Sequence, residues 1–175
     1  CMRAYQITGK KNYDTISELA LQPFLFSVED GGITADIPEG PFYEEYPSTV
    51  PVLVLNGKIF ALCGIYDFMR THSGHAIAEK IFVEGVRTLT RVLPKYDMGY
   101  WSKYSLCEAD FHPKIDPATI GYHYLHIVQL KLMRKMTGQH VFQKYAEKWE
   151  HVVNYKNILK MYVKKYVALR KMKRL

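Results

Sequence analysis

The sequence contains few of the residues that mark disordered, collagen-like or disulfide-rich proteins. Its 175 residues include only 3 cysteines, 8 prolines and 11 glycines, whereas 48% are hydrophobic and 14% are aromatic. A collagen needs far more glycine, a disordered chain has few aromatic residues, and a disulfide scaffold needs more cysteine. Cys1, Cys63 and Cys107 are odd in number and lack metal-site spacing. The composition therefore indicates one ordered globular domain over residues 1–175.

Long hydrophobic runs are also missing. The longest, Val50–Met69, is interrupted by Asn56, Lys58 and Asp67, whereas a membrane-spanning helix needs about 20 apolar residues in a row. No apolar segment near residue 1 resembles a secretory signal. No phosphate-binding glycine loop or Gly-x-Ser-x-Gly turn occurs, which disfavours nucleotide chemistry and serine hydrolysis. Residues 1–9 read as the end of a helix that has no start, so we expect a fragment of a longer protein.

The positive charge gathers near the C-terminus. The net charge is +7, but residues 131–175 hold 13 Lys/Arg and two acids, a balance of +11, which leaves −4 for the rest. Two interpretations stay open. Ile158, Met161, Tyr162, Tyr166 and Leu169 recur at helical spacing opposite the lysines, as in a packed amphipathic helix with a solvated face. Alternatively, the lysines bind a polyanion such as an acidic glycan or a membrane surface.

An internal repeat predicts the architecture. Gly9, Gly74 and Gly138 lie 65 and 64 residues apart, each between two apolar helical patterns, so each period is predicted to be a helical hairpin. Pro23 and Pro94 end the second helix of the first two hairpins. Long connections over residues 25–51 and 95–120 follow these prolines, and we expect them to share one face. The prediction is a mainly all-α fold, an incomplete α/α toroid with long loops and small β-hairpins on one face.

The two connections are rich in tyrosine and acid. Long loops are often functional. Aromatic rings beside carboxylates suit sugar binding, but the tyrosines would also be explained if they only pack the loops against the helices. Pro47 forces Tyr46 into an extended conformation beside Glu45, just before a helix that we expect to open near Val52 and to carry Asn56 in its first turns.

Two further patterns fall on predicted helices. His123 and His126 are three residues apart, but no third ligand lies nearby in sequence, so we expect no metal. With Gln129 they are predicted to hydrogen-bond to neighbours or to a ligand. Gly57 and Gly64 are seven residues apart on one helix face, which something approaches closely, either a partner helix or a sugar ring.

Taken together, these segments resemble the C-terminal domain of the D-glucuronyl C5-epimerases over residues Arg3 to about Trp149. The resemblance rests on Arg3-Ala4-Tyr5, Pro23-Phe24 with Asp30-Gly31-Gly32, Tyr43-Glu44-Glu45-Tyr46-Pro47, Val54-Leu55-Asn56-Gly57, Gly64-Ile65-Tyr66-Asp67, Leu93-Pro94-Lys95-Tyr96-Asp97, Tyr104-Ser105-Leu106, and Tyr122-His123 with His126 and Gln129-Leu130. Members of this family have a β-rich upstream region and an incomplete toroid, with the active site in the cleft between them.

The resemblance implies conversion of D-glucuronate to L-iduronate within a heparan-type polysaccharide, by removal and opposite-face return of the C5 proton. The implied catalytic residues are Tyr46, Tyr104, Tyr122 and Glu45, with Glu45 on the face opposite Tyr122. Substrate binding is expected at Asn56, Lys103, His123, His126, Gln129 and Tyr96. No cofactor is implied. The expected partner is an acidic polysaccharide rather than nucleic acid, with a homodimer and membrane association left open.

One departure from the family affects these expectations. The usual Tyr-Asp-Leu-Arg reads Tyr104-Ser105-Leu106-Cys107, so the arginine that would face a carboxylate is lost. Either Lys103 or another cation replaces it, or the substrate differs, or activity is weak. The alternatives are a polysaccharide lyase with the same first step and a non-catalytic helical module that binds polyanions. We expect a cytoplasmic location for a bacterial protein and a Golgi one for an animal-like protein.

Overall fold

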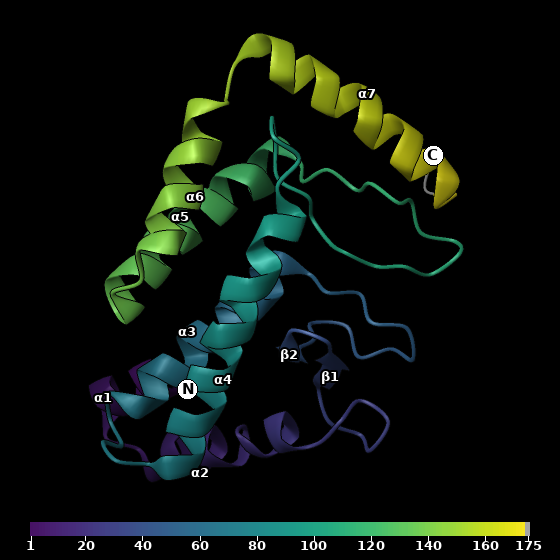
Figure 1. The fold of residues 1–175 in the computed structure, drawn as a ribbon. Helices are drawn as coiled ribbons and strands as arrows, with labels where there is room; N and C mark the ends of the chain where they lie inside the picture. The colour runs from purple at the N-terminus through teal and green to yellow at the C-terminus, as the bar shows by residue number, and fades with distance from the viewer. Residues whose placement is uncertain (174–175) are drawn as a thin grey trace.

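The computed structural model describes residues 1–173, which are mainly helical with one small β-hairpin. In chain order the elements are α1 (Met2–Thr8), α2 (Lys11–Leu19), η1 (Gln22–Leu25), β1 (Thr34–Ile37), β2 (Gly40–Tyr43), α3 (Leu55–Met69), α4 (Ala76–Val92), η2 (Leu93–Tyr96), α5 (Ile120–Thr137), α6 (His140–His151) and α7 (Tyr155–Lys171). The pairs α1–α2, α3–α4 and α5–α6 pack as helical hairpins, and α3 also packs against α5 (Figure 1). The predicted mainly helical fold class with a small β-hairpin is confirmed.

The helix ends follow from glycine and proline. Gly9 and Gly138 adopt left-handed backbone conformations, with φ of 68° and 72°, and end α1 and α5. Gly74, at φ 79°, instead lies in the turn that follows α3, five residues beyond its last residue, Met69. Pro23 and Pro94 each end an α-helical pattern, and a short 3-10 turn follows.

The third helix begins at Leu55, three residues later than the sequence suggested. The buried carboxylate of Glu44 accepts hydrogen bonds from the backbone N–H groups of Val52 (3.0 Å) and Leu53 (3.1 Å). Leu53 has a positive φ of 55°, which turns the chain before the helix starts. Tyr96 is fully buried and donates its hydroxyl hydrogen to the Leu53 carbonyl at 2.6 Å. These contacts fix where α3 starts.

The hairpin β1–β2 lies in the first long connection and packs on α4 and α3. Tyr43 donates to the carbonyl of Ile81 on α4 at 2.6 Å. Lys58 of α3 is fully buried, donates to the Pro41 carbonyl at 2.9 Å and lies 3.6 Å from the centre of the Tyr43 ring. Both long connections lie on the same side of the helices (Figure 1), as the repeat predicted.

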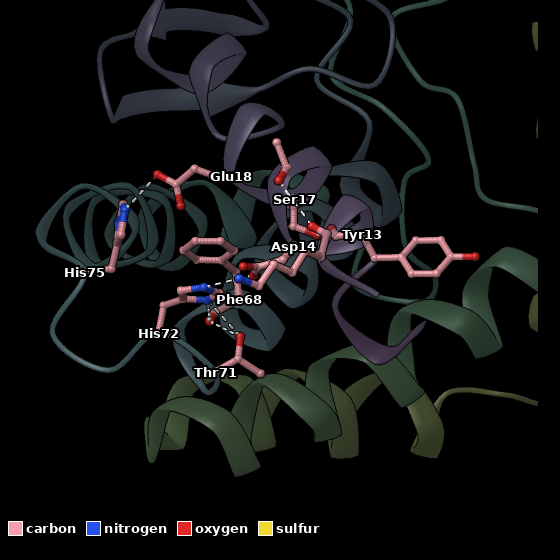
Figure 2. A network of polar contacts seen from close by, with 10 residues as sticks. Tyr13, Asp14, Ser17, Glu18, Phe68, Thr71, His72 and His75 are labelled. Carbon is pink, nitrogen blue, oxygen red and sulfur yellow. Dashed lines mark hydrogen bonds and ion pairs between the residues drawn. The ribbon is translucent and has the colours of Figure 1, made fainter. Parts of the chain in front are cut away.

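On the opposite side, two histidine–carboxylate pairs attach α2 to the turn between α3 and α4 (Figure 2). His72 lies 3.0 Å from Asp14, and His75 lies 3.0 Å from Glu18. The second ring nitrogen of His75 accepts the Ala78 N–H and caps α4. These histidines therefore have structural roles at helix ends.

No helix in residues 1–173 combines the length and the apolar character that crossing a membrane requires.

Two helical glycines give a test of the packing. A methyl group at Gly85 of α4 would lie 2.5 Å from the Tyr43 ring and 2.7 Å from Leu62, whereas one at Gly64 of α3 would meet none of the described residues within 4 Å. We expect Gly85→Ala to lower the free energy of unfolding by about 1–3 kcal/mol through overpacking. Gly64→Ala should raise it by about 0.5–1 kcal/mol, because alanine favours the helix. Urea unfolding of both variants measures the difference, and equal effects would contradict the packing.

Candidate functional site

The second long connection places Tyr104 at the start of α3. The N–H of Tyr104 donates to the Asp116 carbonyl (2.8 Å), and the Tyr104 carbonyl accepts from the N–H of Leu55 (3.2 Å). Tyr122 lies on the first turn of α5, where the Thr119 side chain caps the helix. The Tyr104 and Tyr122 rings meet edge to face, with centroids 4.9 Å apart. Two segments that are distant in sequence thus bring two phenols together.

The first connection brings Glu45 and Tyr46 to the same place. Glu45 packs on the backbone of α3 at Gly57, where a methyl group would lie 2.5 Å from Glu45 Oε2 and 2.7 Å from its Cβ. The residue that approaches this helix face is therefore Glu45, whereas a methyl group at Gly64 would meet no atom of residues 1–173 within 4 Å. Gly57 leaves the space in which the carboxylate lies.

The electrostatics of this site keep the phenols of Tyr46 and Tyr104 protonated. The negative charge of Glu45 raises the pKa of Tyr46. Partial burial raises the pKa of Tyr104 strongly, and Tyr122, Glu45 and Tyr46 add to that effect. At neutral pH the phenols of Tyr46 and Tyr104 are therefore neutral and can donate protons. We refer to Glu45, Tyr46, Tyr104 and Tyr122 as the tyrosine cluster.

The cluster is open to solvent on one side. Tyr46 and Tyr122 are 54% and 38% exposed, and Tyr104 is half-buried. A groove of about 460 Å³ lies elsewhere, between α1, α2 and α3, and none of the predicted site residues lines it. The cluster is thus a face rather than an enclosed pocket.

A positive charge reaches the cluster from α7. Lys165 Nζ lies 5.6 Å from the centre of the Tyr104 ring and 2.6 Å from the buried carboxylate of Asp116. Asp116 is the residue whose carbonyl accepts the Tyr104 N–H. Lys103, predicted to bind substrate, is half-buried, and its backbone N–H donates to the Tyr96 carbonyl at 2.8 Å.

Behind the cluster, His123 and His126 share one serine. Both histidines are fully buried, and their Nδ1 atoms lie 2.8 and 2.9 Å from Ser102 Oγ. His123 Nδ1 also accepts the Ser102 N–H (3.2 Å), so its proton is on Nε2, which donates to the Trp149 carbonyl (3.1 Å). Trp101 stacks on the His123 ring with centroids 3.8 Å apart. The two histidines thus join the second connection to α5 and α6.

Burial keeps both histidines neutral. It lowers the pKa of His123 to about 4. Burial, with a smaller effect from His123, lowers the pKa of His126 to about 3. Across residues 1–173, no three His, Cys, Asp or Glu side chains gather as a metal site would require.

The other predicted binding residues are also behind the exposed face. Gln129 is buried and donates to the backbone carbonyl of Asn56 at 3.1 Å, which links α5 to the first turn of α3. Asn56 is buried, and the Tyr96 hydroxyl is occupied by Leu53. These side chains therefore support the cluster from within the fold.

Four supporting residues were not predicted: Glu44, Lys58, Ser102 and Lys165. The sequence could have indicated burial only for Lys58. It follows Leu55 by three residues and therefore lies on the same, buried face of α3. Ser102 and Lys165 act through partners far away in sequence, which no local pattern reveals.

The buried histidines predict a loss of stability in mild acid. Their pKa values are about 4 and 3 in the folded state and about 6.5 when unfolded. The unfolded chain therefore binds more protons below pH 6.5, so stability is complete above that pH and falls as pH decreases. We expect a slope of up to about 1.4 kcal/mol per pH unit for each histidine between pH 6.5 and 5.

Urea unfolding from pH 7 to pH 5 measures this slope. His126→Met should remove about half of it, whereas His151→Gln, at an exposed position, should leave it unchanged. Burial also raises the pKa of Glu44. Protonation of this carboxylate therefore increases stability as the pH falls toward 5, opposite to the effect of the histidines. A flat profile would show that the histidines are not held neutral.

Comparison with known proteins identifies two relatives and a family. The chain is similar to a Caenorhabditis elegans protein named D-glucuronyl C5-epimerase, with 29% identity over 84% of this chain and 26% of the relative. It is also similar to the uncharacterized protein MJ1128 of Methanocaldococcus jannaschii, with 35% identity over 83% of this chain and 46% of the relative. The chain thus spans between a quarter and a half of these relatives.

The family described as D-glucuronyl C5-epimerase C-terminus matches residues 1–151, which include the tyrosine cluster and both buried histidines but not α7. A match over most of the chain establishes its membership, and the chain therefore belongs to the D-glucuronyl C5-epimerase C-terminus family.

Proposed function

We propose that this domain supplies the catalytic face of a uronate C5-epimerase, which converts D-glucuronate to L-iduronate residues within an acidic, heparan-type polysaccharide. The observation that carries the proposal is the tyrosine cluster, in which one carboxylate and three phenols meet from three separate segments of the chain. In the resemblance described above, the active site lies between an upstream β-rich region and this domain. The open side of the cluster suits such a cleft.

The chemistry needs two groups on opposite faces of the sugar. The base takes the C5 proton, and the electron pair left behind moves toward the uronate carboxylate. A second group then returns a proton to C5 from the other face, which inverts the centre. We assign the Glu45 carboxyl group as the base in this direction, and the phenols of Tyr122 and Tyr104 as the groups that return the proton. In the reverse direction a phenolate takes the proton and Glu45 returns it.

The reverse direction requires a stabilised phenolate, and the intermediate needs positive charge near the uronate carboxylate. An unperturbed tyrosine has a pKa of about 10 and is a weak base at neutral pH. Cys107, where the family has arginine, is buried. Lys165, near the Tyr104 ring, is the cation that we assign to this role, with Lys103 as the alternative. Fixed positive charge at that position favours the transition state over the bound sugar.

If Glu45, Tyr104 and Tyr122 transfer the proton, removing their reacting atoms should abolish the exchange of the C5 proton with solvent. The full-length protein is incubated with desulfated glucuronate polymer in D₂O, and NMR follows deuterium at C5 and the iduronate signals. We expect both signals for the unchanged protein. Glu45→Gln and the double variant Tyr104→Phe, Tyr122→Phe should lose more than about a hundredfold in rate, because they remove the proton-transferring groups.

Tyr124→Phe is the matched control, because Tyr124 is an exposed tyrosine two residues from Tyr122 outside the cluster. Retained exchange in the double variant would disprove the catalytic assignment. An unsaturated uronate that absorbs ultraviolet light would identify the reaction as a lyase with the same first step.

A second prediction concerns the position of Glu45 rather than its chemistry. In Gly57→Ala the new methyl group would overlap Glu45, so the carboxylate must move. A displacement of about 1 Å is expected to lower the exchange rate by about a hundredfold. Gly64→Ala, on the same helix with free space around it, should keep full activity. Equal rates for the two variants would show that Glu45 is not held against α3 during the reaction.

A further inference from the structure

Helix α7 lies outside the part of the chain that matches the family and packs over the second long connection (Figure 1). Asn154 caps its start by accepting the Asn157 N–H at 3.0 Å. On its inner face, Met161 and Ala168 are almost completely buried, and Lys165 forms its ion pair with Asp116. The ammonium of Lys160 lies 3.9 Å from the centre of the Tyr100 ring. The inner face of α7 is therefore fixed.

The outer face of α7 is apolar and exposed. Six large side chains are more than half exposed along this one helix: Tyr155, Leu159, Tyr162, Val163, Tyr166 and Val167. Their spacing of three and four residues places them on one arc of the helix, turned away from the buried Met161 and Ala168. A helix face that only meets water would carry polar side chains at these positions.

Positive charge lies beside this apolar arc. Lys156, Lys164, Arg170 and Lys171 are exposed on the same helix, and no Asp or Glu follows Glu150 in the sequence. An apolar arc with aromatic rings and a basic border is the pattern of helices that lie in the interface of a membrane. Its charge is complementary to anionic headgroups.

We propose that the outer face of α7 binds the surface of an anionic lipid bilayer. Leu159, Val163 and Val167 enter the boundary of the acyl chains, the tyrosines lie at the level of the headgroups, and the lysines contact the lipid phosphates or carboxylates. An acidic glycan would also attract the lysines, but it offers nothing to three aliphatic side chains. The bilayer accounts for both properties of the face, and the binding is independent of the proposed epimerase activity.

The first test removes the aliphatic contacts. The protein is sedimented with vesicles of phosphatidylcholine with and without phosphatidylserine. We expect binding only to the anionic vesicles and a loss of more than about tenfold in the variant Leu159→Gln, Val163→Gln, Val167→Gln. These side chains are 57%, 59% and 60% exposed, so the change should not disturb the fold. The control is Val83→Gln, Val128→Gln, at positions on α4 and α5 that are 54% and 62% exposed.

The second test removes charge. Each lysine near an anionic surface contributes about fivefold to binding, so Lys156→Gln, Lys164→Gln, Lys171→Gln should weaken vesicle binding by about a hundredfold. The control is Lys80→Gln, Lys135→Gln, Lys144→Gln, which removes the same charge from exposed sites on α4, α5 and α6. Added salt should weaken the binding of the unchanged protein.

Three outcomes would overturn the proposal. One is the absence of binding to anionic vesicles by the folded protein. Another is an equal loss of vesicle binding in the α7 variants and in their controls, which would indicate that the vesicles attract the protein through its net charge alone. The third is binding to a soluble glucuronate polymer in place of vesicles. This binding would depend on the lysines but not on Leu159, Val163 or Val167.

Discussion

The tyrosine cluster depends on one buried carboxylate, that of Glu44. By accepting the N–H groups of Val52 and Leu53, it ends the first long connection and fixes where α3 begins. Tyr96 adds a hydrogen bond to the Leu53 carbonyl from the second connection. A carboxylate with its bonds satisfied is stable inside a protein, but an unpaired one costs several kcal/mol. The first turn of α3 is thereby fixed in a position where Glu45 can pack against Gly57.

Buried polar side chains form a layer behind the solvent-exposed tyrosine cluster and hold together the segments that carry it. Ser102 joins His123 and His126, and Gln129 joins α5 to α3 through the Asn56 carbonyl. Because burial keeps the histidines neutral, this layer needs no counter-charge and adds none to the cluster. In front of this layer, the negative charge of Glu45 raises the pKa of Tyr46 and keeps its phenol protonated at neutral pH.

Local sequence patterns predicted the helical framework, because the signals are local. Gly9, Gly138, Pro23 and Pro94 act on the backbone within a turn of their own position, and the structure confirms each helix end. The cluster residues came from the family resemblance, and the structure places them together. The supporting contacts escaped prediction, since Ser102 meets His126 and Asp116 meets Lys165 across 24 and 49 residues. Such pairings depend on the finished packing rather than on periodicity.

The second long connection joins the two surfaces of the domain. Its residue Asp116 contacts Tyr104 through the backbone and α7 through the ion pair with Lys165. The inner face of α7 is therefore coupled to the cluster, while the outer residues Val163 and Val167 contact solvent. A membrane that binds the outer face would fix the orientation of the cluster relative to the lipid surface without touching a reacting group. The helix separates its lysines by direction: Lys165 and Lys160 contact the second connection, whereas Lys164 is exposed.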